Sequence, residues 1–116
     1  MLKISVYNLS KNSLLGQEIM HADSYWRRFR GLLGKKELQF GEGLLLTPCK
    51  AVHSIGMRFS LEIIYLDRSN RAVHIMTLKP NRLGPFISNA YQVLELPLGT
   101  VSYSKTALGD LFSTRT

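Results

Sequence analysis

The apolar residues of this chain fall in short runs separated by turn-forming residues, and this pattern most constrains its fold. Four of the runs are predicted strands, at residues 44–47, 61–66, 72–78 and 91–96. Pro, Gly, Asn and charged residues separate them, and residues 67–70 are typical of a hairpin connection. The pattern predicts a chain rich in antiparallel β-structure.

The two ends of the sequence are predicted to add further strands. Apolar and polar residues alternate over residues 2–7, which is the periodicity of a half-buried strand. Residues 8–16 suit a turn before a short strand at 18–21. Toward the other end, residues 101–103 are predicted to begin a strand, and a last apolar pair follows at 111–112.

One main helix is predicted, beginning at Asp23. Trp26 and Leu32 belong to an apolar stripe with helical spacing, and Gly34 suits a left-handed cap at its end. Many short strands and one helix predict an α+β fold, in which a mostly antiparallel, small, barrel-like sheet packs on this helix. The length of 116 residues suits a single domain over residues 1–116.

The formal net charge is +7, and the densest group of basic residues lies on the predicted helix and its exit. Clustered Lys and Arg attract nucleic-acid phosphate or anionic lipid, whereas on a solvated helix face they only keep the domain in water. The sequence shows no recognised nucleic-acid motif, so nucleic-acid binding is an alternative that rests on charge alone. The residues that carry this alternative are Arg27, Arg28, Arg30, Lys35 and Lys36.

The first residues do not read as a signal peptide, because apolar and polar residues alternate there. No stretch approaches the roughly 18–20 apolar residues that a transmembrane helix needs. We therefore expect a soluble protein in the cytoplasm, with export of a longer precursor left open. The single cysteine, Cys49, excludes an intrachain disulfide and any multi-cysteine zinc site.

Cys49 and His53 form the most unusual local arrangement in the sequence. Four residues apart, they form a thiolate–imidazolium pair if the loop between them brings them within hydrogen-bond reach. Lys50 and Arg58 would then favour the thiolate. The alternative is a small buried cysteine and a histidine that hydrogen-bonds a backbone group, and for a lone cysteine this alternative is favoured.

The sequence predicts no cofactor and no metal site. Neither C-x-x-C nor H-x-x-x-H spacing occurs, and the glycines form no phosphate loop or dinucleotide fingerprint. Asp67, at the end of an apolar run, is either a ligand-binding carboxylate or the cap of a turn. Glu62 and Glu95 lie inside apolar runs, where they either face solvent or are inward acids with a raised pKa.

Several motifs occur in a specific order: Arg30-Gly31-Leu32-Leu33, Gly43-Leu44-Leu45, Cys49-x-x-x-His53-x-x-Gly56-Met57-Arg58, residues 61–67, residues 93–100 and Gly109-Asp110. In this order the chain resembles the domain of unknown function 192 family over about residues 15–112. The resemblance implies a compact β-rich fold with one packed helix and brings no established activity. It implies a group of candidate residues at one mouth of the barrel, which are Arg30, Cys49, His53, Met57, Arg58, Glu62, Asp67 and Glu95.

Three functions are compatible with these residues. The first is a binding or accessory module for a small anionic ligand or a partner protein, in which Arg30 and Arg58 anchor negative charge and His53 orients it. The second is an enzyme with Cys49 as nucleophile, His53 as base or acid and Arg58 as anion stabiliser. The third is the electrostatic association with nucleic acid described above.

Overall fold

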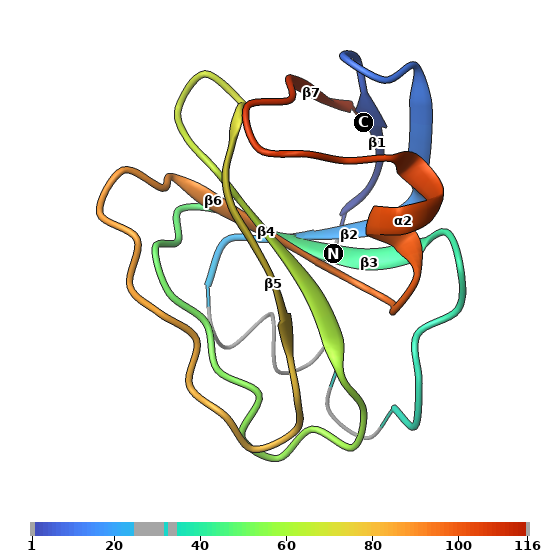
Figure 1. Cartoon of the computed structure of the whole chain (residues 1–116). Helices are drawn as coiled ribbons and strands as arrows, with labels where there is room; N and C mark the ends of the chain where they lie inside the picture. Colours follow the sequence, from blue (N-terminus) through green and yellow to red (C-terminus); the bar gives the residue numbers. More distant parts are fainter. Residues whose placement is uncertain (1, 25–31, 33–34, 116) are drawn as a thin grey trace.

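The computed structural model describes residues 2–24, 32 and 35–115. Within these residues the chain forms strands and one short helix, arranged as Figure 1 shows. The strands are β1 (Leu2–Asn8), β2 (Ser13–Ala22), β3 (Glu42–Leu46), β4 (Leu61–Leu66), β5 (Ala72–Leu78), β6 (Gln92–Leu96) and β7 (Phe112–Arg115), and the helix is α2 (Thr100–Ser104).

The strands form one mixed, curled sheet in the order β5-β4-β6-β3-β2-β1-β7. Neighbouring strands are antiparallel except β2 and β3, which run parallel. Strand twist and the irregular register of β1 on β2 curl the sheet into a half-barrel. An isolated bridge between Arg71 and Leu111 joins its two ends at one corner. The predicted barrel-like, mostly antiparallel sheet is confirmed.

The predicted strands at 61–66 and 72–78 are confirmed to the residue. The turn predicted over residues 8–16 is shorter than expected, because Asn12 takes a left-handed conformation (φ 51°) and β2 already begins at Ser13. The long helix predicted from Asp23 to Gly34 lies mostly outside the described residues. Leu32, which is described, is buried in the core at 2% exposure.

The prediction that residues 101–103 begin a strand is wrong, because they belong to α2. Gly99 turns the chain in the left-handed region with φ 95°, and the Tyr103 amide donates to its carbonyl at 2.9 Å. The Glu62 side chain, on β4, accepts a hydrogen bond from the Val101 amide at 2.7 Å. A contact with a strand distant in sequence therefore overrides the β-propensity of Val and Tyr.

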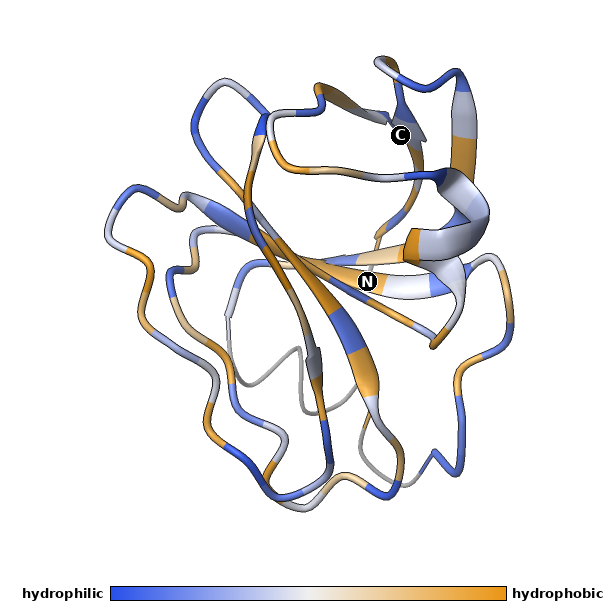
Figure 2. Ribbon diagram, viewed as in Figure 1, coloured by the Kyte–Doolittle hydropathy of each residue, from blue (hydrophilic) through white to orange (hydrophobic). Residues whose placement is uncertain are grey.

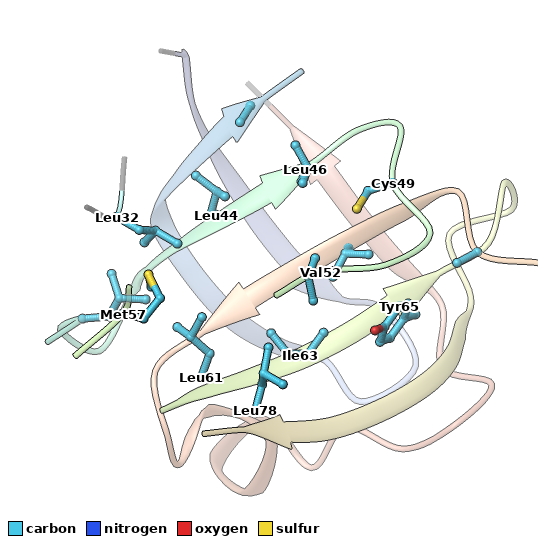
Figure 3. Packing of buried hydrophobic residues seen from close by; sticks show 14 residues of the cluster. Leu32, Leu44, Leu46, Cys49, Val52, Met57, Leu61, Ile63, Tyr65 and Leu78 are labelled. Carbon is cyan, nitrogen blue, oxygen red and sulfur yellow. The ribbon is translucent and has the colours of Figure 1, made fainter. Parts of the chain in front are cut away.

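Apolar side chains cover both faces of the sheet. One face carries a cluster that includes Val6, Ile64 and Leu94, together with Phe112 of β7 and Val101 of α2. The other, which includes Leu44 and Ile63, is the cluster drawn in Figure 3. None of the helical segments that the structure describes is long and apolar enough to span a membrane.

Candidate functional site

Two loops, residues 47–60 after β3 and residues 79–91 after β5, run side by side in opposite directions (Figure 1). We call them the loop pair. Backbone hydrogen bonds join them from the Cys49 amide to the Tyr91 carbonyl (2.8 Å) up to the Ser54 amide and the Arg82 carbonyl (2.9 Å). Between these, the Gly84 amide donates to the Val52 carbonyl at 2.8 Å. The loop pair therefore has a fixed backbone although it contains no regular strand.

The inner side of the loop pair is apolar and closes the core. Cys49, Val52 and Met57 are buried, with 6%, 3% and 8% exposure, in the cluster that also contains Tyr65 (Figure 3). The Tyr65 hydroxyl donates to the Pro85 carbonyl at 2.8 Å, which ties the second loop to β4. The loop pair thus depends on the same packing as the sheet.

Polar side chains hold the base of the loop pair. The Thr47 hydroxyl donates to the Gln92 side-chain oxygen at 2.7 Å, and the Gln92 amide nitrogen donates to the Asn70 side chain at 2.6 Å. His21 Nε2 lies 3.1 Å from the same Thr47 oxygen. Since that hydroxyl has one hydrogen and gives it to Gln92, His21 Nε2 is the donor.

Ser54 is the hub at the far end of the loop pair, and it is fully buried. Its carbonyl accepts from the amides of Met57 (3.0 Å) and Asn81 (2.9 Å). Its hydroxyl donates to the Lys79 carbonyl and accepts from the Arg82 amide at 2.9 Å. Sequence reasoning missed this residue because its partners on the second loop lie 25 to 28 positions away, and the Ser-x-Gly turn gave the only local signal.

Large apolar side chains lie exposed on the outer side of the loop pair. Ile55, Leu83 and Phe86 have exposed fractions of 54%, 76% and 68%. Leu83 forms an isolated β-bridge with His53, which brings the two loops together next to Ile55. Figure 2 shows hydrophobic and hydrophilic residues interspersed along both loops.

The loop pair is strongly basic. Residues 47–60 and 79–91 contain four Lys and Arg residues and no Asp or Glu. All four cations are exposed. The two whose side chains form hydrogen bonds use neutral carbonyl groups, since Lys50 donates to the Ser88 carbonyl and Arg82 to those of Pro80 and Asn81.

We call the exposed cations and large apolar residues of the loop pair the basic apolar tip. Its members are Lys50, Ile55, Arg58, Lys79, Arg82, Leu83 and Phe86.

Cys49 and His53 lie on this loop pair and each has a local backbone contact. The Cys49 thiol is buried and donates to the Ala51 carbonyl at 2.9 Å. The half-buried His53 ring accepts at Nδ1 from the Ile55 amide at 3.3 Å. The pairing of Cys49 with His53 stays a prediction.

Two of the predicted carboxylates, Glu62 and Asp67, lie at opposite ends of β4. Glu62, near the start of β4, bonds the Val101 amide of α2. Asp67, just beyond the other end of β4, accepts from the amides of Ser69 (2.9 Å) and Arg71 (3.0 Å) and so caps the hairpin turn. Five residues of extended strand separate these carboxylates by about 16 Å, which is too far for a shared ligand contact.

Glu95 is fully buried in the middle of β6. Its register partners are Leu44 on β3 and Ile63 on β4, both of which belong to the cluster beneath the loop pair. Of the other residues that the resemblance groups with it, Met57 is buried and Arg58 is exposed.

The basic group predicted on the helix is largely outside the described residues, since Arg27, Arg28 and Arg30 all lie there. Lys36 is exposed and the Lys35 ammonium lies 3.9 Å from the Glu42 carboxylate. Across residues 2–24, 32 and 35–115, no three His, Cys, Asp or Glu side chains lie together as metal ligands would.

A buried network around Asp110 was also missed by the sequence analysis. Its carboxylate accepts from Asn8 Nδ2 (3.0 Å), the Ala107 amide (2.9 Å) and the Lys11 ammonium (2.8 Å). Burial alone would raise the pKa of Asp110, but the hydrogen bonds from Asn8, Lys11 and Ala107 outweigh it and hold the pKa below its ordinary value. The network joins Asn8 and Lys11 to Asp110, about 100 residues later in the chain, so its role is to hold the fold together.

Comparisons with known proteins fit this architecture. The family model DUF192, described as an uncharacterized ACR, matches residues 8–114. A UPF0127 protein of Pyrococcus horikoshii is 33% identical over 108 residues, covering 90% of this chain and 94% of that protein. One of Thermococcus kodakarensis is 30% identical over 112 residues, covering 93% and 71%. A protein of unknown function from Novosphingobium aromaticivorans shares the fold, with TM-score 0.78 and 19% identity over 97% of this chain and 84% of that one.

Proposed function

We propose that this chain, which belongs to the DUF192 (UPF0127) family, is a binding module whose basic apolar tip recognises an anionic partner. The observation that carries the proposal is the charge of the loop pair. Four exposed cations lie on two loops that contain no carboxylate. Such a one-sided distribution attracts anions and raises their local concentration at the surface.

The individual cations support this role to different degrees. Among the described residues, the side chains of Arg58 and Lys79 have no hydrogen-bond or ion-pair partner, so their charges are available to a ligand. Arg58 offers a planar guanidinium that suits bidentate contact with a carboxylate or phosphate. An exposed ion pair contributes about 1 kcal/mol or less, so we expect several of the four cations to act together.

The buried residues of the loop pair support binding rather than thiol chemistry. The Cys49 thiol lies on the inner side among Val52 and Tyr65, with its hydrogen bonded to a carbonyl. A nucleophilic thiol needs an accessible, electropositive surrounding that stabilises its anion. In this arrangement Cys49 packs the core while the cations of the tip face outward.

The experiment compares two double variants on an immobilised polyanion, heparin. Arg58→Gln with Lys79→Gln removes two charges from the tip, and Lys105→Gln with Arg115→Gln removes two exposed charges elsewhere. We expect the tip variant to elute at clearly lower salt than both the wild type and the control, because polyanion binding depends on the number of contacting cations. Equal elution of the two double variants would contradict the proposal.

The alternative through Lys35 and Lys36 is separated by a third double variant. Lys35→Gln with Lys36→Gln also removes two charges, but from the segment that follows the predicted helix. If this variant loses retention while the tip variant keeps it, the polyanion binds at the helix and the proposed tip site is wrong. Thermal melts of all three variants check that the fold is retained.

A further inference from the structure

We infer that the anionic partner of the basic apolar tip is the surface of a lipid bilayer. This inference rests on the proposed function and adds the class of partner. It comes from the three apolar side chains that the cations accompany. Ile55, Leu83 and Phe86 are between about half and three-quarters exposed, which a purely electrostatic site does not require.

The combination of these residues matches the two layers of a membrane interface. Aliphatic and aromatic side chains enter the boundary between headgroups and acyl chains, while Lys and Arg remain at the level of the headgroups. Lys and Arg side chains close to a membrane are attracted by the negative surface potential of anionic lipids. The tip supplies both parts on one loop pair, and its sequence supplies no carboxylate to oppose them.

The backbone of the tip is also prepared for a poorly hydrated environment. Peptide groups that leave water without a partner are costly. At the tip the amide of Ser54 is bonded to the Arg82 carbonyl and that of Arg82 to the Ser54 hydroxyl. The Gly56 amide donates to the Asn81 side chain at 2.9 Å, and the Gly84 amide donates to the Val52 carbonyl. Entry into the headgroup region therefore leaves these groups paired.

The apolar residues also distinguish a bilayer from a nucleic acid. Proteins that bind single-stranded nucleic acid stack bases on aromatic side chains and guanidinium groups. Two of the three apolar residues here, Ile55 and Leu83, are aliphatic and offer no face for stacking. Their burial in an acyl layer is favourable in proportion to their exposed apolar area.

The test is co-sedimentation of the full chain with vesicles of phosphatidylcholine, with or without phosphatidylglycerol. We expect the wild type to pellet with the anionic vesicles and to remain in solution with the neutral ones. Leu83→Ser and Phe86→Ser should each weaken vesicle binding by about tenfold while heparin retention stays unchanged. Leu98→Ser and Leu108→Ser are the matched controls, since they alter leucines of 55% and 65% exposure outside the loop pair.

The outcomes separate the two proposals. Retention on heparin without any binding to anionic vesicles would overturn the bilayer inference and leave the anion-binding module intact, with an acidic protein or a nucleic acid as the partner. Equal loss in Leu98→Ser and Leu83→Ser would also overturn it, because the tip would then have no special part. If the wild type binds neither heparin nor anionic vesicles, both proposals are refuted.

Discussion

Replacing Ser54 by alanine tests whether the loop pair is held as one unit by its buried hub. The Ser54 hydroxyl donates to the Lys79 carbonyl and accepts from the Arg82 amide. Each hydrogen bond contributes about 1 kcal/mol net, and leaving a buried partner unsatisfied costs about 1–3 kcal/mol. Because these two hydrogen bonds are only partly buried, water reaches part of the freed backbone. We therefore expect a loss of about 2 kcal/mol in the free energy of unfolding.

Urea unfolding measures this loss directly, and a thermal melt gives a second estimate. At about 5 °C per kcal/mol for a domain of this size, the Tm should fall by about 10 °C. Ser88→Ala is the matched control, since Ser88 lies on the same loop pair with an exposed side chain and contributes only its carbonyl to Lys50. Hydrogen exchange should show faster exchange of the Arg82 amide in Ser54→Ala than in Ser88→Ala.

Two results would refute the reasoning. If Ser54→Ala changed the free energy of unfolding by less than about 0.5 kcal/mol, its effect would be that of an ordinary surface substitution. The contacts of the Ser54 hydroxyl would then not hold the loops together. An equal loss in Ser88→Ala would show that any change in the loop pair has the same effect. In both cases the fixed backbone of the tip would need another origin.

Three further predictions concern the rest of the molecule. Because its folded pKa is lowered, the ionised Asp110 stabilises the protein fully above its unfolded pKa, about 3.9, and this stabilisation is lost as the pH falls through the lower folded pKa. Urea unfolding across this range should show a steeper pH dependence in the wild type than in Asp110→Asn. Identical slopes would contradict this prediction. Buried Cys49 should react slowly with a thiol reagent in native buffer and rapidly in urea; fast native labelling would restore the thiol hypothesis. Gly43→Ala would place a Cβ 2.6 Å from the Glu95 carbonyl oxygen, so its Tm should fall by an amount equivalent to about 2 kcal/mol; an unchanged Tm would show that β3 and β6 can separate freely.

The strands were predictable from the sequence because their signal is local. The pattern over residues 61–78 contains two β-rich runs and the Asp67 turn between them, and the structure has this hairpin at the predicted residues. The parallel pairing of β2 and β3 has no such signal. It depends on the course of the connection between them, which short-range periodicity does not determine.

The positions of Glu62 and Glu95 in the sheet show why the candidate site was harder to predict than the strands. Both lie inside apolar runs, and the sequence left open whether each faces solvent or the interior. The sheet register turns Glu62 toward α2 and places Glu95 between two apolar neighbours on adjacent strands. Strand order decides these environments, and strand order comes from contacts between distant residues.

The tip shows the same limit. Arg58 was predicted because it belongs to a motif, whereas Lys79, Arg82 and Leu83 were not. They join the surface only because the second loop pairs with the first across roughly 30 residues. A charge count over either loop by itself gives two cations, and the combined surface carries four.

The pairing of β1 with β7 has a consequence for how the protein is made. Val6 is opposite Thr114 in that ladder, so one edge of β1 stays without its neighbour until the ribosome has added roughly a hundred more residues. An unpaired strand edge is a template for association with other chains. During synthesis the nascent chain therefore carries an open edge that its own final strand must close, and this interval is when chaperone binding would matter most.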